Sequence, residues 1–289
     1  MEHRVVWVHG IGDHRPGYSA PWEQSFNTHL ALPHESYVEV VWETVFDAAR
    51  RAMREERRGD RAPIRLSRRE QLAEAEVREQ LKAILVARAS AFGEARPPDP
   101  TLRRGRGAAT RDTIEWSAVQ RASRQRGVFD WLPRVDEYIG DFTAYLVSPR
   151  VRAAVQEEAK KILRPFASSD FRISIIAHSW GTVVAYDSLL DLEQETPDLS
   201  VAHLFTLGSP LWLVRFLLED PSGRKPDGLG TWMNIDARGD LIGSWLSPAF
   251  EVDRDLQVPS FGDGDPHGSY LVAGNDAVQR DLIASTILA

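Results

Sequence analysis

The clearest pattern of apolar and polar positions lies between residues 171 and 190. Ile173, Ile175 and Ile176 are β-branched and apolar, as expected of a strand buried on both faces of a parallel sheet. After a short break, apolar side chains recur at helical spacing over 183–190. The pattern predicts a strand, a sharp turn and a helix.

Similar patterns recur along the rest of the chain. Short apolar runs predict strands at 4–8, 37–43, 201–207 and 232–236. Amphipathic patterns predict helices at 22–32, 150–163 and 275–288. Strands that alternate with helices are typical of an α/β protein with a mainly parallel sheet. We therefore expect one α/β domain over residues 1–289.

The character of the chain changes between residues 46 and about 126. Residues 48–126 contain 20 of the 35 lysines and arginines but 11 of the 42 aspartates and glutamates. Apolar side chains in this stretch recur at helical spacing, namely Leu72, Val77, Leu81, Ile84 and Leu85. We expect an Arg-rich, cap-like helical insertion, and within it a mobile loop at 97–107, where Pro, Gly and Arg replace the periodicity.

The arginines of this insertion leave more than one interpretation open. Clustered arginines attract the phosphates of nucleic acid or of an anionic membrane, but a solvated face near an acidic body explains them equally well. Nucleic acid is disfavoured as a partner because no stacking aromatics or known reading motif accompany the charge. A peripheral contact with an anionic membrane remains a hypothesis.

Composition narrows the possible chemistry and location. A hydrophobic content of 43% suits an ordinary globular core. The absence of cysteine excludes disulfides, thiolate nucleophiles and cysteine-based metal sites. No apolar run approaches the length of a membrane-spanning helix, and the first residues lack the architecture of a signal peptide. We therefore expect a cytoplasmic protein.

The turn after the strand at 171–178 contains the first candidate for chemistry. Ala177-His178-Ser179-Trp180-Gly181 is close to the G-x-S-x-G nucleophile elbow, in which small residues flank a serine on a sharp strand-to-helix turn. Ser179 is therefore the candidate nucleophile. The alternative is that Ser179 only caps a buried helix.

The first predicted strand ends at His9-Gly10-Ile11-Gly12. Glycines here would let the backbone approach a substrate oxygen, so the N–H of Ile11 or Gly12 is a candidate oxyanion donor together with that of Trp180. The alternative is a plain strand-to-helix turn in which His9 makes a structural hydrogen bond.

A serine nucleophile needs a histidine to accept its proton and a carboxylate to orient that histidine. Only His203 and His267 follow Ser179 in the chain, and His203 lies within a predicted buried strand, which leaves His267. Asp240 and Asp236 are the candidate acids. We favour Asp240 because it lies beyond the end of its predicted strand, which gives the order serine, acid, histidine.

These motifs together resemble those of a known enzyme family. The matching segments are Val8-His9-Gly10-Ile11-Gly12, 177–187, Leu207-Gly208-Ser209-Pro210, 234–240 and His267-Gly268-Ser269-Tyr270. They resemble serine esterases and lipases of the α/β-hydrolase superfamily, nearest to its intracellular phospholipase branch. The match covers the core at both ends of the chain and not the insertion, and Ala177 replaces the first glycine of the elbow motif.

The resemblance implies a three-layer α/β-hydrolase fold and a serine carboxylester hydrolase. Ser179 would attack the ester carbonyl of a small-molecule or lipid substrate, His267 would act as base and then acid, and Asp240 would orient it. No cofactor or metal is implied. His9, Gly10 and Trp212 are expected to contact the substrate.

Two questions stay open at this point. The apolar segment 211–218, which contains Trp212, suits either a lid or acyl-chain wall or an ordinary core helix. The same triad would also serve an acyltransferase, a thioesterase or a peptidase, because they share the acylation step. A non-catalytic scaffold whose basic insertion binds a partner or an anionic membrane is the alternative from a different class.

Overall fold

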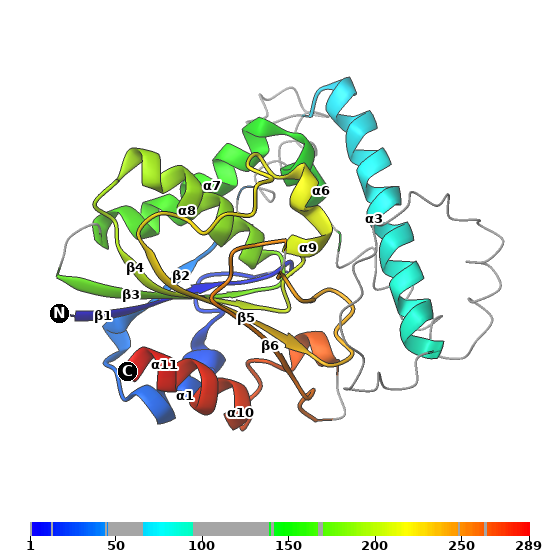
Figure 1. Ribbon diagram of the computed structural model, residues 1–289. Helices are drawn as coiled ribbons and strands as arrows, with labels where there is room; N and C mark the ends of the chain where they lie inside the picture. Colours follow the sequence, from blue (N-terminus) through cyan, green and yellow to red (C-terminus); the bar gives the residue numbers. More distant parts are fainter. Residues whose placement is uncertain are drawn as a thin grey trace.

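The computed structural model describes residues 2–12, 14–43, 45, 66–94, 139, 142–166, 170–247, 249–262 and 265–289. Within them, parallel strands form a six-stranded sheet in the order β2-β1-β3-β4-β5-β6 (Figure 1). The strands are β1 (Glu2–Val8), β2 (Tyr37–Val40), β3 (Phe171–His178), β4 (Val201–Leu207), β5 (Leu229–Ala237) and β6 (Arg254–Val258). The expected α/β class and mainly parallel sheet are confirmed.

The register of the sheet aligns the ends of its central strands. Val8 of β1 pairs with Ala177 of β3, Ala177 with Thr206 of β4, and Thr206 with Asn234 of β5. Because these strands are parallel and in register, their carboxyl ends lie at one edge of the sheet. The loops that follow β1, β3, β4 and β5 therefore meet there.

One face of the sheet, the upper one in Figure 1, is covered by described helices that precede or follow the central strands. They are α6 (Phe142–Val147), α7 (Pro149–Leu163), α8 (Gly181–Glu195) and α9 (Leu211–Val214), the last continued by η4 (Arg215–Leu217). Val6 and Ile175 of the sheet share one buried apolar cluster with Val155 of α7. The helix predicted at 150–163 is thus confirmed, and segment 211–218 forms a short helical stretch.

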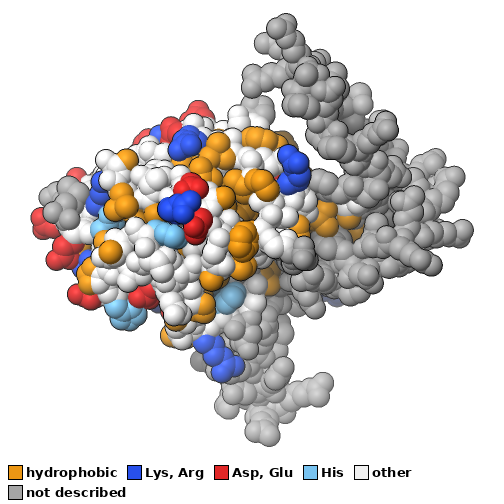
Figure 2. All heavy atoms as spheres, turned by 90° about the horizontal axis from the view of Figure 1, so that it is seen from below, with side chains coloured by type: hydrophobic (Ala, Val, Ile, Leu, Met, Phe, Trp, Pro, Cys, Tyr) orange, Lys and Arg blue, Asp and Glu red, His pale blue; other side chains and the backbone are white. Residues whose placement is uncertain are grey.

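The opposite face is covered by α1 (Ala20–Leu30) and by the C-terminal run of α10 (Asp276–Val278), the π-helix η6 (Gln279–Ala284) and α11 (Ser285–Leu288). Val5 and Ile176 of the sheet are buried with Phe26 of α1 on this side. Successive strand residues therefore face different cores, as a sheet with two covered faces requires. On the surface over this side, described acidic and basic side chains are interspersed (Figure 2).

Part of the expected insertion is a long helix, α3 (Arg68–Glu94, 27 residues). It begins with a capping box, because Ser67 Oγ accepts from the Glu70 N–H at 3.2 Å and Glu70 Oε2 accepts from the Ser67 N–H at 2.6 Å. Leu81 and Leu85 are buried in the same core cluster as Phe142 of α6 and Val155 of α7. The helical prediction is therefore confirmed for α3.

The basic excess of the insertion does not belong to α3. This helix contains five basic and five acidic residues, so the surplus of arginine lies elsewhere in 48–126. The expected loop at 97–107 also lies outside the described residues. The predicted membrane contact through the insertion therefore remains a prediction.

Other expectations are met with small differences. The strands at 4–8, 171–178, 201–207 and 232–236 are confirmed, and the strand at 37–43 ends earlier, at Val40. Strand β6 was not expected. No helix in the described part of the chain is both long and apolar enough to cross a bilayer.

Candidate active site

Ser179 occupies the turn between β3 and α8. Its φ of +55° is unusual for a residue other than glycine. The Ser179 N–H donates to the carbonyl of Leu207 at 2.9 Å, which ties the turn to the end of β4. The side chain is buried, yet it lies at the edge where the strand ends meet.

Small residues allow this turn to form against the loop after β1. A Cβ on Gly10 would lie 2.7 Å from Ser179 Cβ, and one on Gly181 would lie 2.2 Å from the carbonyl oxygen of His9. Both distances are too short for real side-chain carbons. Ala177, which stands where the elbow motif usually has glycine, is fully buried, so its methyl group fits.

His267 lies within hydrogen-bond distance of both Ser179 and Asp240. Its Nε2 is 2.8 Å from Ser179 Oγ, and its Nδ1 is 3.0 Å from each carboxylate oxygen of Asp240. An ionised carboxylate only accepts hydrogen bonds, so Nδ1 carries the proton and Nε2 is left to accept from the serine hydroxyl. The structure thus brings together the three side chains proposed from the sequence as nucleophile, acid and base.

Asp240 lies in the turn after β5 and is almost completely buried. Its Oδ1 accepts from the N–H groups of Ile242 at 2.8 Å and Gly243 at 3.0 Å, and its Oδ2 accepts from the Tyr270 hydroxyl at 2.6 Å. Burial alone raises the pKa of Asp240, but the charge of His267 and these hydrogen bonds outweigh it and hold the pKa below its usual value. Asp240 is therefore ionised at neutral pH.

His178 supports the histidine loop from the end of β3. Its Nε2 donates to the backbone carbonyl of His267 at 2.7 Å. Burial, with the nearby His267 adding to it, lowers the pKa of His178 to about 3, so its ring is neutral at physiological pH. Beyond its place beside Ser179, nothing in the sequence singled out His178.

A cavity of about 280 Å³ opens on the Ser179 and His267 side chains. Gly10 and Ile11 form part of its wall, and Trp22 and Leu271 supply apolar surface. Its walls come from the loops after β1 and β3, from α1 and from the loop around η5 (Pro266–Gly268). Ser179 and His267, the proposed nucleophile and base, therefore face a space that can hold a small ligand.

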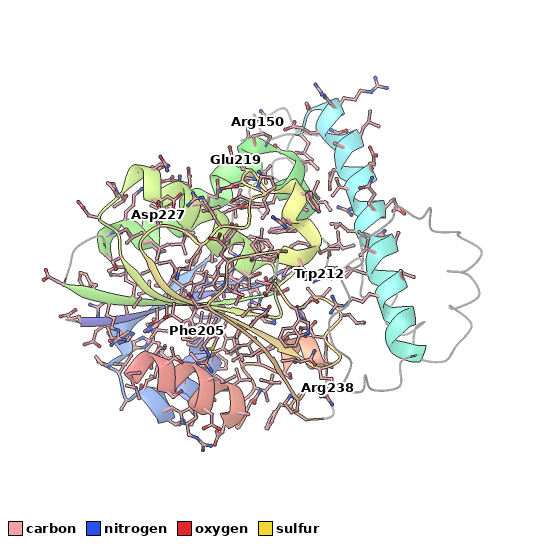
Figure 3. All side chains as sticks on the ribbon, in the orientation of Figure 1. Arg150, Phe205, Trp212, Glu219, Asp227 and Arg238 are labelled. Carbon is pink, nitrogen blue, oxygen red and sulfur yellow. The ribbon has the colours of Figure 1, made fainter. Side chains whose placement is uncertain are left out.

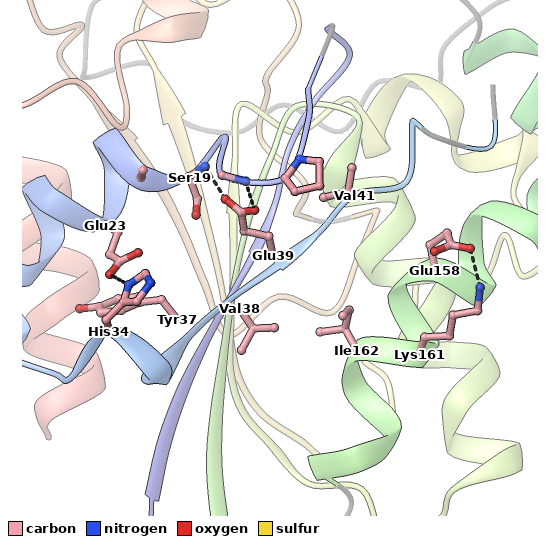
Figure 4. Close-up of a pocket in the computed structure, with 13 residues that line it drawn as sticks. Ser19, Glu23, His34, Tyr37, Val38, Glu39, Val41, Glu158, Lys161 and Ile162 are labelled. Carbon is pink, nitrogen blue, oxygen red and sulfur yellow. Dashed lines mark hydrogen bonds and ion pairs between the residues drawn. The ribbon is translucent and has the colours of Figure 1, made fainter. Parts of the chain in front are cut away.

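A larger hollow of about 560 Å³ lies at the β2 edge of the sheet, between α1 and α7 (Figure 4). Its wall includes Glu39, whose carboxylate accepts from the N–H groups of Gly17 and Ser19 at 2.6 Å each. Glu39 thus holds the loop before α1 in place. Because Ser179 and His267 face the smaller cavity, we take that cavity as the candidate active site despite its size.

The loop after β1 corrects one expectation. The Gly12 N–H donates to Glu43 Oε1 at 2.6 Å, so Gly12 is not the oxyanion donor in this conformation. Gly12 is also not among the described residues that line the cavity, whereas Ile11 is. Of the two donors considered in this loop, Ile11 therefore remains the candidate. Trp180 lies at the start of α8, directly after Ser179.

Trp212 and His9 are placed away from the described cavity wall, contrary to expectation. The Trp212 Nε1 donates to the carbonyl of Ile242 at 2.7 Å, and its ring lies on the side of α9 that faces α3 (Figure 3). His9 stacks on Trp42 at 4.9 Å, and burial, with His14 nearby, lowers its pKa to about 3. Both side chains therefore support the loops around the site.

The two rejected alternatives for acid and base lie in different surroundings. Asp236 accepts from Gln257 Nε2 of β6 at 3.0 Å, and its Oδ1 has no hydrogen-bond partner among the described residues. His203 lies in β4, where its Nδ1 is 2.8 Å from Ser174 Oγ. Neither is a hydrogen-bond partner of Ser179 or His267 in the described part of the chain.

No cluster of described His, Asp and Glu side chains has the arrangement needed to hold a metal ion. In comparisons with known proteins, no family model matches the sequence and no curated protein was matched.

Proposed function

We propose that this protein is a serine hydrolase with an α/β-hydrolase fold, which cleaves a carboxylic ester through an acyl-enzyme intermediate. The observation that carries the proposal is the unbroken hydrogen-bonded line from Ser179 Oγ through His267 to Asp240, with distances of 2.8 and 3.0 Å. A strained backbone at the serine and a cavity in front of it support the proposal further.

The position of the site in the sheet gives independent support. The chain passes from β1 to its neighbour β2 on one side, and from β3 to β4 and β5 on the other side. In open parallel sheets, ligands bind at the carboxyl ends of the strands where this direction reverses. That point lies between β1 and β3, where Gly10 and Ser179 face each other.

The first half of the proposed reaction forms the acyl-enzyme. Ser179 Oγ attacks the carbonyl carbon while its proton passes to Nε2 of His267, and Asp240 stabilises the resulting imidazolium. The backbone N–H groups of Trp180 and Ile11 would stabilise the negative oxygen of the tetrahedral intermediate, aided by the positive end of the α8 dipole.

The second half releases both products. His267 returns the proton to the leaving alcohol oxygen as the C–O bond breaks, which leaves the acyl group on Ser179. A water molecule then loses a proton to His267 as it attacks the acyl carbon, and the same proton returns to Ser179 Oγ when the acid departs. One ester and one water give one acid and one alcohol.

The cavity bears on the class of substrate. Pockets for drug-sized ligands enclose roughly 300–1,000 Å³, and the cavity at Ser179 encloses about 280 Å³. Its size favours a compact acyl or alcohol group next to the nucleophile, from a small-molecule ester or the end of a lipid.

The test is covalent labelling combined with ester hydrolysis. We expect a fluorophosphonate to label Ser179 and p-nitrophenyl esters of graded chain length to be hydrolysed, with acid as the product. Ser179→Ala should abolish labelling and lower kcat by at least about 10⁴-fold. Ser188→Ala, which removes a buried hydroxyl on α8 that has no described hydrogen-bond partner, should leave both unchanged. A folded wild type that is neither labelled nor active on any ester would reject the proposal.

A further inference from the structure

Tyr270 links three parts of the site. It follows His267 by three residues, and its side chain is almost completely buried. Its hydroxyl oxygen is 2.6 Å from Asp240 Oδ2 and 2.8 Å from the N–H of Ala237 at the end of β5. One phenol therefore connects the histidine loop, the carboxylate and the sheet.

The direction of these bonds is fixed by chemistry. The backbone N–H of Ala237 can only donate, so the Tyr270 oxygen accepts from it. The phenol proton is then directed to the ionised carboxylate of Asp240, which can only accept. Bonds from a neutral donor to a charged acceptor are short and strong, and 2.6 Å agrees with that.

Each carboxylate oxygen of Asp240 has its own donors. Oδ1 accepts from the N–H groups of Ile242 and Gly243, whereas Oδ2 accepts from Tyr270, and both oxygens lie 3.0 Å from His267 Nδ1. Without the phenol, His267 would be the one described hydrogen-bond partner of Asp240 Oδ2, a buried and charged oxygen. The backbone donors at Oδ1 would remain, but the phenol that fixes Oδ2 against rotation of the carboxylate would be lost.

The ring of Tyr270 is also fixed by packing. It belongs to the apolar cluster between the sheet and the C-terminal helices. A Cβ on Gly208 would lie 3.0 Å from Tyr270 Cε2 and 2.7 Å from Asp240 Oδ2, so the two groups fill the space next to that glycine. The hydroxyl is thus presented to Asp240 by a rigid side chain.

We propose that Tyr270 is a positioning residue, which holds the Asp240 carboxylate in the orientation that aligns His267 with Ser179. The inference rests on the proposed serine-hydrolase function. Tyr270 is not among the described residues that line the cavity, so it acts on the rate through Asp240 and not through contact with the substrate.

The chain offers a matched control for the test. The hydroxyl of Tyr145 donates to Asp187 Oδ2 at 2.7 Å, also between buried side chains, but Tyr145 belongs to the cluster on the opposite face of the sheet. Tyr270→Phe and Tyr145→Phe therefore remove the same kind of hydrogen bond. Only Tyr270→Phe removes it from the proposed acid.

We expect Tyr270→Phe to lower kcat for p-nitrophenyl acetate by about 10- to 100-fold, the range that corresponds to losing a hydrogen bond to a charged group. KM should change by less than about twofold, because a positioning residue affects the reacting arrangement more than ground-state binding. Tyr145→Phe should leave kcat and KM within about twofold of the wild type. Equal kcat values for the two variants would overturn the inference.

A double-mutant cycle separates positioning from a general structural effect. If Tyr270 acts through the carboxylate, Tyr270→Phe should lower kcat by less than about threefold in the Asp240→Asn background. An equal fold-loss in both backgrounds would count against the inference. Replacing Tyr270 with 4-aminophenylalanine, which keeps a donor at the same position, should restore most of kcat even if Tyr270→Phe folds poorly.

Labelling separates the two proposals from each other. A folded wild type that the fluorophosphonate does not label at Ser179 and that hydrolyses no ester would reject the proposed function. A labelled, active wild type whose rate is unaffected by Tyr270→Phe would reject only the role of Tyr270.

Discussion

Gly208 shapes the candidate site although it has no side chain. It follows β4, between the strands that precede Ser179 and Asp240, and its φ is +57°. A Cβ there would lie 2.7 Å from Asp240 Oδ2 and 3.0 Å from His267 Nδ1. Asp240 and His267, the proposed acid and base, can therefore lie together beside the end of β4 only because residue 208 has no Cβ.

Gly208→Ala should accordingly displace the Asp240 carboxylate. Because misplacement of reacting groups by about 1 Å can cost roughly 100-fold in rate, we expect kcat for p-nitrophenyl acetate to fall by about that factor. The measurement is steady-state kinetics on a variant whose folding has been checked by circular dichroism.

Gly262→Ala provides the control at another glycine with positive φ. Its φ is +74°, and no described atom lies within 4 Å of a Cβ built there. Alanine in a left-handed conformation costs about 1–2 kcal/mol, so both variants should lose stability. Only Gly208→Ala should lose activity, and comparable kcat values for the two would contradict the proposed arrangement of acid and base.

At the scale of the elements, helix α3 contacts the turn around Asp240 through the side chain of Arg88. Arg88 Nη2 donates to the carbonyl oxygens of Asp240 at 3.2 Å and Gly243 at 2.5 Å. The Arg88 guanidinium also lies over the ring of Trp212, 4.6 Å from its centroid. The helix of the insertion therefore braces the turn that carries the proposed acid.

Arg88→Ala should loosen that turn. We expect kcat to fall by about tenfold, because hydrogen bonds from a charged donor contribute about 1.5–3 kcal/mol and part of that loss is felt as misplacement of Asp240. Lys82→Ala on the same helix removes a pair with Glu79 at 3.4 Å at the surface, which contributes little. If both variants kept wild-type kcat, the bracing role of α3 would be wrong.

The elements with strong local patterns could be predicted from the sequence. The β-branched run of β3 and the helical spacing of α8 gave the strand, turn and helix around Ser179. Strand β6 was missed because its sequence, Arg254-Asp255-Leu256-Gln257-Val258, is polar and it forms the sheet's edge, partly exposed. Leu256 and Val258 alternate with Gln257, but this pattern is too short to predict a strand.

For the candidate site, chain order and residue type were enough to select Ser179, Asp240 and His267. What the sequence could not provide were contacts between distant segments. The Gly12 N–H donates to Glu43, 31 residues away, and the Trp212 indole N–H donates to the carbonyl of Ile242. Such partners depend on tertiary packing, which local spacing does not encode.

At the scale of the whole molecule, buried histidines couple folding to pH. Burial lowers the pKa of His9 and His178 to about 3 and, with the charge of Arg172 adding to it, that of His203 to about 4. These side chains stay neutral in the folded state, whereas in the unfolded chain they take up protons near pH 6.5. Folding free energy is therefore lost as the pH falls below about 6.5 toward the folded pKa values.

Two buried carboxyl groups oppose this effect. Burial raises the pKa of Asp187 and Asp236 to about 6. In the folded state they bind protons that the unfolded chain does not bind until lower pH, so they add stability as the pH falls through about 6. The two sets therefore act in opposite directions on the free energy of unfolding as the pH falls through about 6.

His203→Gln removes a side chain that takes up about one proton on unfolding between pH 6 and 5. As the pH falls through that range, the free energy of unfolding should decrease by about 1.4 kcal/mol per pH unit less in the variant than in the wild type. Urea denaturation at several pH values measures both slopes. Parallel curves for the two proteins would show that His203 is protonated alike in the folded and unfolded states.

The spacing of the proposed triad along the chain also sets an order of events during synthesis. Eighty-eight positions separate Ser179 from His267. At roughly 5–20 residues per second, the ribosome needs about 4–18 s to extend the chain from one to the other. Throughout that interval the nascent serine lacks its base and is an ordinary, unreactive alcohol. In the proposed mechanism, Ser179 would therefore become reactive only after His267 has been added to the chain.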